Sequence, residues 1–210
     1  MKNLREFWEK EWRTHPRLVS STRYKMINFG YQETMLDVGC GSLAFPDLMI
    51  DRSKYLIGCD ISVRALKRAK PNIKWFKKKI DLIQCSATNL PFKENVFDRV
   101  VCLETLSLMG KDYEDAFKEM CDATKNYLSF NVTHHDSCPD SESFDVVSFN
   151  REELEDLLKK LNLEIVEMYE FTRDECKNFG LPIHEQTYSA KGDAKMTIVA
   201  TAKKVYPTSS

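Results

Sequence analysis

The sequence lacks an apolar run long enough to cross a lipid bilayer. None of its hydrophobic stretches approaches the roughly 18 residues that mark a candidate spanning helix. The opening residues, Met1 to Glu6, are mostly polar, with no apolar core and no small-residue cleavage site, so we expect no secretory signal. These two absences predict a cytoplasmic protein without a membrane partner.

Cysteine pairs of the C-x-x-C type and an excess of one charge are also missing. The seven cysteines are an odd number and several lie in apolar runs, which favours buried, reduced thiols and predicts no metal site. The net charge is −1, from 31 basic and 32 acidic residues, and therefore provides no overall field that would attract nucleic acid. Nucleic acid is not expected as a partner, although a local basic patch stays possible. The oligomeric state is left open.

The order of apolar and polar segments indicates a layered α/β fold. A length of 210 residues suits one domain with a full core. From Thr34 onward, short apolar runs alternate with helix-like segments, which predicts a parallel sheet covered on both faces. The expected strands are 35–38, 55–59, 82–85, 99–103 and 127–132, and the expected helices lie near 46–53, 62–70 and 112–125.

The two ends of the chain carry further elements. Near the start, Phe7, Trp8 and Trp12 recur at helical spacing, which predicts an amphipathic helix before the main domain. Near the end, a capped helix is expected to begin after Asn150, followed by strands at 163–172 and 196–202. The last of these is expected to insert as an antiparallel strand.

The segment Met35–Ser42 carries the strongest chemical signal. It is an apolar strand that ends in a Gly-x-Gly turn, where glycine permits a tight turn and a close approach of a ligand to the backbone. Asp60 closes the next apolar run, at the place from which a carboxylate binds the ribose hydroxyls of an adenosine ligand. Two alternatives stay open: a plain strand-to-helix turn for the glycines, and a helix N-cap for Asp60.

The same segment disfavours a dinucleotide as its ligand. A pyrophosphate needs three glycines at the start of the helix, but Leu43 and Phe45 crowd that position. The carboxylate of Asp37 would also repel phosphate. A sulfonium ligand with an amino group suits this carboxylate instead.

Together these motifs resemble the class I S-adenosylmethionine-dependent methyltransferases, in particular the small single-domain group that includes the ubiquinone/menaquinone-biosynthesis enzymes. The resemblance covers about residues 34–132 and rests on four segments: Leu36–Gly41, Gly58–Ser62, Cys85–Phe92 and Asn95–Val101. It implies S-adenosyl-L-methionine as the cofactor. The cofactor-binding residues that it implies are Asp37, Gly39, Cys40, Gly41, Asp60, Ile61, Ser86, Ala87 and Leu103.

Within that resemblance, the glycine turn and Asp37 face the methionine part of the cofactor, Asp60 holds the ribose, and Ile61, Ser86 and Ala87 border the adenine. Two departures stand out. Leu43 occupies the place of the family's third glycine, and Ser86 stands where many relatives carry an aspartate. A serine hydroxyl still accepts a hydrogen bond, but without a charge.

The implied fold is α/β: a Rossmann-like, doubly wound, seven-stranded, mostly parallel sheet with an antiparallel C-terminal strand and an N-terminal helical extension. The expected organisation is an N-terminal helical lid at 1–30, a methyltransferase domain at 31–205 and a disordered tail at 206–210.

Three residues are candidates for the catalytic step. Glu104 follows the fourth expected strand and is a candidate for orienting a substrate amine or accepting a proton, against the alternative of a solvated carboxylate. His134 and His135 follow the fifth strand and are candidate general bases, against a metal site or an ordinary polar loop. Trp8, Trp12 and Tyr24 of the lid are expected to contact the substrate, against simple packing on the sheet.

The expected activity is direct, in-line transfer of a methyl group to an O, N, S or C nucleophile of a small molecule. One alternative is an RNA or protein methyltransferase, for which the basic stretch Arg64–Lys79 is the support. The other is a non-catalytic cofactor-binding or scaffold protein, suggested by Leu43 and Ser86.

Overall fold

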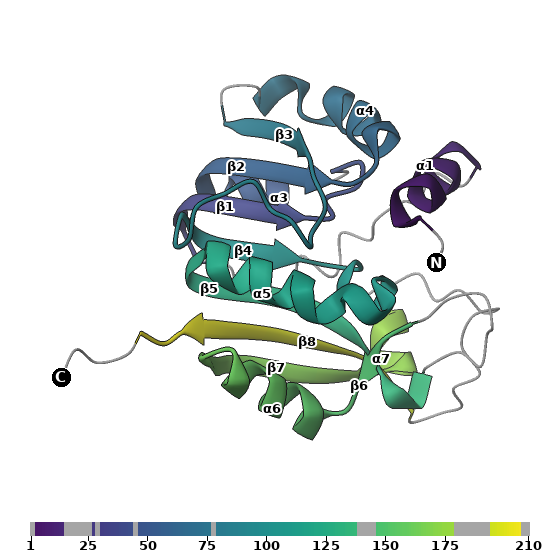
Figure 1. Ribbon diagram of the computed structural model, residues 1–210, viewed down its shortest axis with the longest axis vertical. Helices are drawn as coiled ribbons and strands as arrows, with labels where there is room; N and C mark the ends of the chain where they lie inside the picture. Colours follow the sequence, from purple (N-terminus) through teal and green to yellow (C-terminus); the bar gives the residue numbers. More distant parts are fainter. Residues whose placement is uncertain are drawn as a thin grey trace.

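One sheet organises the computed structural model, which describes residues 3–14, 27, 30–43, 46–76, 79–137, 146–178 and 194–206. Its main path runs in the order β3-β2-β1-β4-β5-β8-β7 (Figure 1). Strand β8 is antiparallel to both of its neighbours, whereas the pairs from β3 to β5 are parallel. The strands are β1 (Gln32–Val38), β2 (Ser53–Asp60), β3 (Ile80–Gln84), β4 (Phe97–Cys102), β5 (Thr124–His134), β7 (Leu163–Thr172) and β8 (Lys195–Lys204).

The expected seven-stranded, mostly parallel sheet with an antiparallel C-terminal strand is therefore confirmed. One element was not expected: the two-residue strand β6 (Ser148–Phe149) pairs in parallel with the end of β5 and makes the sheet eight-stranded. The strand order reverses at β1, which lies between β2 and β4. In an open α/β sheet, such a reversal leaves a crevice beyond the carboxyl ends of the strands.

Helices cover both faces of the sheet, as the alternation predicted. On one face, α5 (Tyr113–Ala123) and α6 (Arg151–Lys160) contribute Phe117 and Leu158 to a core cluster that also contains Leu36 of β1. On the other face, α3 (Pro46–Ile50) and α4 (Val63–Asn72) pack against Met35, the neighbouring residue of β1. The two core clusters thus draw on alternate residues of the same strand, as the two-residue period of a strand requires.

Helix boundaries differ slightly from the expected ranges. The predicted helix at 46–53 ends at Ile50, because Asp51 and Arg52 form the turn into β2, which begins at Ser53. The cap after Asn150 is confirmed as a full capping box: the Glu153 amide donates to Asn150 Oδ1 over 2.9 Å, and the Asn150 amide donates to Glu153 Oε2 over 3.0 Å. The remaining α-helix, α7 (Arg173–Asn178), follows β7.

The ends of the chain meet the expectations in part. Helix α1 (Leu4–Thr14) forms as predicted and lies beside α4, at the end of the sheet toward which the parallel strands point (Figure 1). Tyr206, assigned to a disordered tail, instead donates a hydrogen bond from its hydroxyl to the carbonyl of Lys125 over 2.6 Å. Residues 207–210 lie outside the described part. No described helix combines the length and the apolar character that crossing a membrane requires.

Candidate active site

A cleft lies beyond the carboxyl ends of β1, β2 and β4, beneath α1, and is partly open to solvent. All the predicted cofactor residues line it except Asp37 and Cys40, which are buried below its floor. The lining residues are Leu4, Trp8, Trp12, Val38, Gly39, Gly41, Cys59, Asp60, Ile61, Cys85, Ser86, Ala87, Leu103, Glu104, Thr105, Leu108 and Met109.

The glycine turn after β1 forms the floor of this cleft. Gly39 has a φ of +72° and Gly41 a φ of +56°, both in the left-handed region that favours glycine. A Cβ atom on Gly39 would lie only 2.0 Å from Oγ1 of Thr105, in the loop after β4. Glycine at position 39 therefore satisfies two demands at once, a positive φ and the close packing of the two loops.

Leu43, which stands where the resemblance implies a glycine, has a left-handed backbone conformation. Its φ is +43°, and its side chain is 2% exposed, packed with Met49 and Ile50 of α3. A left-handed conformation costs an ordinary residue about 1–2 kcal/mol. Burial of the leucine side chain offsets that cost, so the substitution preserves the turn.

Asp60, the last residue of β2, is fixed by two backbone hydrogen bonds. Its Oδ2 accepts from the amide of Gly41 over 2.9 Å, and its Oδ1 accepts from the amide of Ser62 over 2.8 Å. Burial raises the pKa of Asp60 to about 6, against the lowering effect of both hydrogen bonds. The N-cap of α4 is Ser62, whose hydroxyl accepts from Ala65, so the alternative role of Asp60 as an N-cap is wrong.

The wall beside Asp60 contains the residues expected around the adenine. Ile61, Ser86 and Ala87 line the cleft together. The Ser86 hydroxyl lies 2.9 Å from that of Thr88, so it also holds its own turn. Cys85 shares this wall, and a hydrogen bond with Cys59 lowers its pKa. The adenine contacts themselves stay a prediction.

Helix α1 roofs the cleft with Leu4, Trp8 and Trp12. The helix is tied to α4 by Glu9, whose Oε1 accepts from the amide of Val63 over 2.6 Å. Trp12, on the same helix, is only 6% exposed. Two of the three predicted substrate residues, Trp8 and Trp12, therefore face the cleft, whereas Tyr24 lies outside the described residues.

Glu104 lines the cleft from the loop after β4, with a φ of +62°. Asn131 of β5 holds it twice. The Glu104 amide donates to Asn131 Oδ1 over 2.7 Å, and Asn131 Nδ2 donates to Glu104 Oε1 over 2.7 Å. The sequence interpretation missed Asn131. Its signal was an amide within the otherwise apolar end of a strand.

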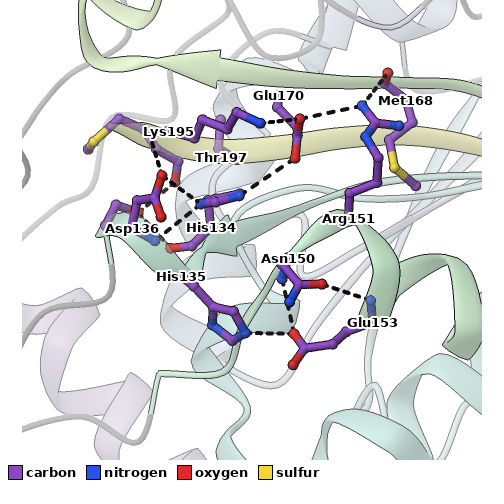
Figure 2. Close-up of polar contacts among 12 residues, drawn as sticks. His134, His135, Asp136, Asn150, Arg151, Glu153, Met168, Glu170, Lys195 and Thr197 are labelled. Carbon is purple, nitrogen blue, oxygen red and sulfur yellow. Dashed lines mark hydrogen bonds and ion pairs between the residues drawn. The ribbon is translucent and has the colours of Figure 1, made fainter. Parts of the chain in front are cut away.

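The two candidate histidines are not among the residues that line the cleft, and Figure 2 shows the polar contacts that they make elsewhere. His134 is buried, with Nδ1 accepting from the amide of Asp136 over 3.1 Å and Nε2 lying 3.6 Å from Glu170 Oε1. Burial lowers its pKa. His135 points instead toward α6, with its Nε2 2.6 Å from Glu153 Oε2. The structure therefore separates both side chains from Asp60 and Glu104.

These residues fit S-adenosylmethionine in three respects. Asp60 places a buried carboxylate in the cleft wall, and a carboxylate has lone pairs for further hydrogen bonds beyond the two it accepts from the backbone. The packed turn at Gly39 leaves no room for a side chain at the floor. Asp37, two residues before Gly39 on β1, is a buried carboxyl group, which offers no attraction to a phosphate.

Comparison with known sequences gives the same class of protein. Residues 36–130 match the family model described as a methyltransferase domain. An uncharacterized protein of Methanocaldococcus jannaschii is 37% identical over 92 residues, which are 44% of this chain. The match spans 36% of the length of that curated relative.

Solved structures share the fold over most of the chain. The 1,6-didemethyltoxoflavin-N1-methyltransferase of Burkholderia thailandensis, which was solved with its substrate and S-adenosylhomocysteine, has a TM-score of 0.73 at 14% identity, over 97% of this chain and 88% of that one. A candidate methyltransferase of Haloferax volcanii, solved in complex with a methyltransferase activator, has a TM-score of 0.73 at 14% identity, over 98% and 97%.

An S-adenosylmethionine-dependent methyltransferase of Mesorhizobium loti has a TM-score of 0.65 at 16% identity, over 88% of this chain and 96% of that one. At such identities these structures establish the fold. The family match at 36–130 covers the glycine turn, Asp60 and Glu104. Residues 36–130 therefore match a methyltransferase domain, and the chain shares the Rossmann-like fold of these S-adenosylmethionine-dependent methyltransferases.

Proposed function

We propose that this protein transfers the methyl group of S-adenosylmethionine to a nucleophilic atom of a small molecule by direct in-line displacement. One observation carries the proposal: a cleft roofed by α1 is lined by Asp60, the glycine turn and Glu104 together. The cofactor supplies a methyl group that its sulfonium charge has already activated. The protein's own contribution is then binding, alignment and exclusion of water.

Each part of the cleft has a role in this proposal. Asp60 would hold the ribose, and the backbone at Gly39 and Gly41 would lie against the methionine part of the cofactor. Trp8 and Trp12 would exclude water from above. Of the three catalytic candidates, Glu104 is the one whose side chain lines the cleft, so it is the residue that we propose to contact the acceptor.

The walls favour a small acceptor over a nucleic acid. Leu108 and Met109, which follow Glu104 in the chain, line the cleft, and the roof adds Trp8 and Trp12. Much of the lining that we assign to the acceptor is therefore apolar. No lysine, arginine or histidine is among the described residues that line it. A phosphate backbone would meet no positive charge there.

The basic stretch Arg64–Lys79 was the support for an RNA substrate, but two of its arginines contact helix α1 instead. The Nε of Arg64 lies 3.3 Å from Glu9 Oε2, and the guanidinium of Arg68 lies 5.9 Å from the ring centroid of Trp12. Two of its cations therefore hold the roof in place. Trp75 in the same stretch is 83% exposed, so an RNA contact on this flank is kept as an outcome of the test.

Two measurements test the proposal. Calorimetry with S-adenosylhomocysteine should show binding, and Asp60→Ala should weaken it about tenfold or more, because a charge-assisted hydrogen bond pair is lost. A screen of metabolites with S-adenosylmethionine should then show S-adenosylhomocysteine production with at least one small molecule. Absence of binding of both cofactor forms would overturn the enzyme proposal.

Two other results would each support a different function. Cofactor binding with transfer only to RNA, and RNA affinity that falls steeply with salt, would identify a nucleic-acid methyltransferase. Cofactor binding with no transfer to metabolites, RNA or protein would identify a cofactor-binding scaffold.

A further inference from the structure

Asn131 makes two hydrogen bonds with Glu104, one with its backbone and one with its carboxylate. Asn131 accepts from the Glu104 backbone amide and donates to Glu104 Oε1, both over 2.7 Å. Glu104 also has a φ of +62°, a conformation that a non-glycine residue adopts at a cost and that its surroundings must maintain. The two hydrogen bonds to Asn131 fix both the strained backbone and the side chain.

The amide of Asn131 has no alternative orientation in these contacts. A backbone N–H is only a donor, so the oxygen of the amide must face the amide of Glu104 and its nitrogen must face Oε1. The nitrogen also lies 3.3 Å from Thr197 Oγ1, whose hydroxyl donates to the carbonyl of Val132 over 2.9 Å. Asn131 is 5% exposed and sits between the paired strands β4 and β8, which make its position rigid.

The lining of the cleft restricts what it accepts. Its carboxyl groups belong to Asp60 and Glu104, and no lysine, arginine or histidine is among the described residues that line it. An anionic acceptor would be repelled there, whereas an N–H group or a cation is attracted. Trp8 and Trp12 also line the cleft, and their large apolar side chains suit a flat apolar body.

We propose that the acceptor is a primary or secondary amine on a flat apolar body, that Glu104 receives its N–H, and that Asn131 is the positioning residue for Glu104. This inference rests on the proposed function. The amine enters neutral, and its lone pair forms the N–CH₃ bond while the bond from sulfur to that methyl breaks and its electron pair stays on sulfur. The nitrogen becomes an ammonium, whose charge the Glu104 carboxylate stabilises, and the ammonium then releases a proton to water.

The test uses three probes with the same phenyl body: 2-phenylethylamine, 2-phenylethanol and phenylacetate. Their binding to the full chain saturated with S-adenosylhomocysteine is measured by NMR titration. The amine should bind tightest and the acid weakest. Glu104→Gln keeps the size of the side chain and removes its charge, so it should weaken amine binding roughly tenfold, leaving the alcohol and S-adenosylhomocysteine nearly unchanged.

Asn131→Ala should reduce the preference for amine over alcohol toward unity while S-adenosylhomocysteine still binds. The matched control is Asn126→Ala, on the same strand, which also removes an amide–carboxylate hydrogen bond, of 3.3 Å to Asp98 Oδ1, away from the cleft. A purely structural role for Asn131 would lower thermal stability without changing the amine preference. If Asn131→Ala does not fold, Glu104→Gln decides alone.

Three results would overturn the inference. The first is an amine that binds no tighter than the matched alcohol, or no binding by any of the three probes at millimolar concentration. The second is Glu104→Gln weakening S-adenosylhomocysteine instead of the amine, because the carboxylate would then serve the cofactor. The third is an unchanged amine preference in Asn131→Ala. If S-adenosylhomocysteine itself does not bind the unaltered protein, the proposed function fails as well.

Discussion

Glu9 of α1 accepts a hydrogen bond of 2.6 Å from the backbone amide of Val63, the first residue of α4. A carboxylate is favoured at this place, because the first amides of a helix have no partner within the helix and its N-terminus carries a partial positive charge. Glu9, an acidic side chain near Asp60, thus links the roof of the cleft to the N-terminus of α4.

Glu9→Gln should loosen this roof. The amide side chain still accepts a hydrogen bond, but it loses the charge and the attraction to Arg64, so we expect S-adenosylhomocysteine to dissociate several-fold faster, by roughly 1 kcal/mol. Stopped-flow tryptophan fluorescence measures the rate. Glu6→Gln, at an exposed position of the same helix, is the control and should leave the rate unchanged. Equal rates in both variants would show that α1 does not retain the cofactor.

Cofactor affinity should depend on pH through Asp60. Its pKa of about 6 means that the carboxylate is charged above this pH and protonated below it. Only the charged form offers its full accepting capacity to two ribose hydroxyls, so the dissociation constant should be flat above neutrality. It should rise up to about tenfold per pH unit below the pKa. Calorimetry across this range measures it, and Asp60→Asn should bind weakly at every pH.

Glu9 also contributes to the raised pKa of Asp60. Glu9→Gln should therefore move the pH midpoint of binding downward. Folding stability should show the opposite dependence for Asp60. Its raised pKa favours the protonated folded state, so this contribution is complete below the unfolded pKa near 3.8 and is lost as the pH rises through about 6. If the pH midpoint of cofactor binding is the same in the unaltered protein, in Glu9→Gln and in Asp60→Asn, Asp60 is not the titrating group.

Gly39→Ala should be far more damaging than Gly30→Ala. Both residues have a positive φ, of +72° and +54°, so the backbone strain of about 1 kcal/mol is common to the two variants. At Gly39 the new methyl group also collides with Thr105, whereas at Gly30 the nearest described atom would be 3.6 Å away, on Gln32. Chemical denaturation should show a clearly larger loss of stability for Gly39→Ala, and calorimetry should show loss of cofactor binding for Gly39→Ala alone. Equal effects would mean that strain, and not loop packing, decides.

At Leu43 glycine should be tolerated better than alanine, the reverse of the usual order. Either replacement removes a buried side chain at a cost of about 2–5 kcal/mol. Glycine additionally relieves the left-handed strain at a φ of +43°, by about 1 kcal/mol. Leu66 in α4 packs in the same core and is the control, where alanine should be better than glycine. Urea denaturation of the four variants gives the comparison.

The sheet was predictable because its signals are local. The apolar runs of strand length, the glycine turn and the Asn150 cap are each encoded by a few consecutive residues. All of them form as expected. The added strand β6 has two residues and no pattern of its own, so nothing in the sequence marks it.

The arrangement of the site was predictable only where the chain order alone fixes it. Asp60 and the glycine turn come from the ends of neighbouring strands, and the fold brings them together. Glu9 meets Val63 across 54 positions and Asn131 meets Glu104 across 27, and neither pair has a spacing that identifies it. His134 lies at the end of β5, as predicted. Its ring, however, lies beside Glu170 of β7, a contact between distant parts of the chain that the sequence does not reveal.

The position of β8 has a consequence for how the chain folds. It follows all the other described strands in sequence, yet it lies between β5 and β7 and pairs with both. While the chain emerges from the ribosome, β5 and β7 must each keep an unpaired edge until β8 has been made, and open edges of this kind invite pairing with other chains. The pairing of β8 with β5 also joins residues that are far apart in the sequence, such as Tyr127 and Lys203, and contacts of this kind form slowly. Completion of the sheet should therefore be the late step of folding, and substitutions in β8 should increase aggregation during synthesis more than equal losses of stability elsewhere.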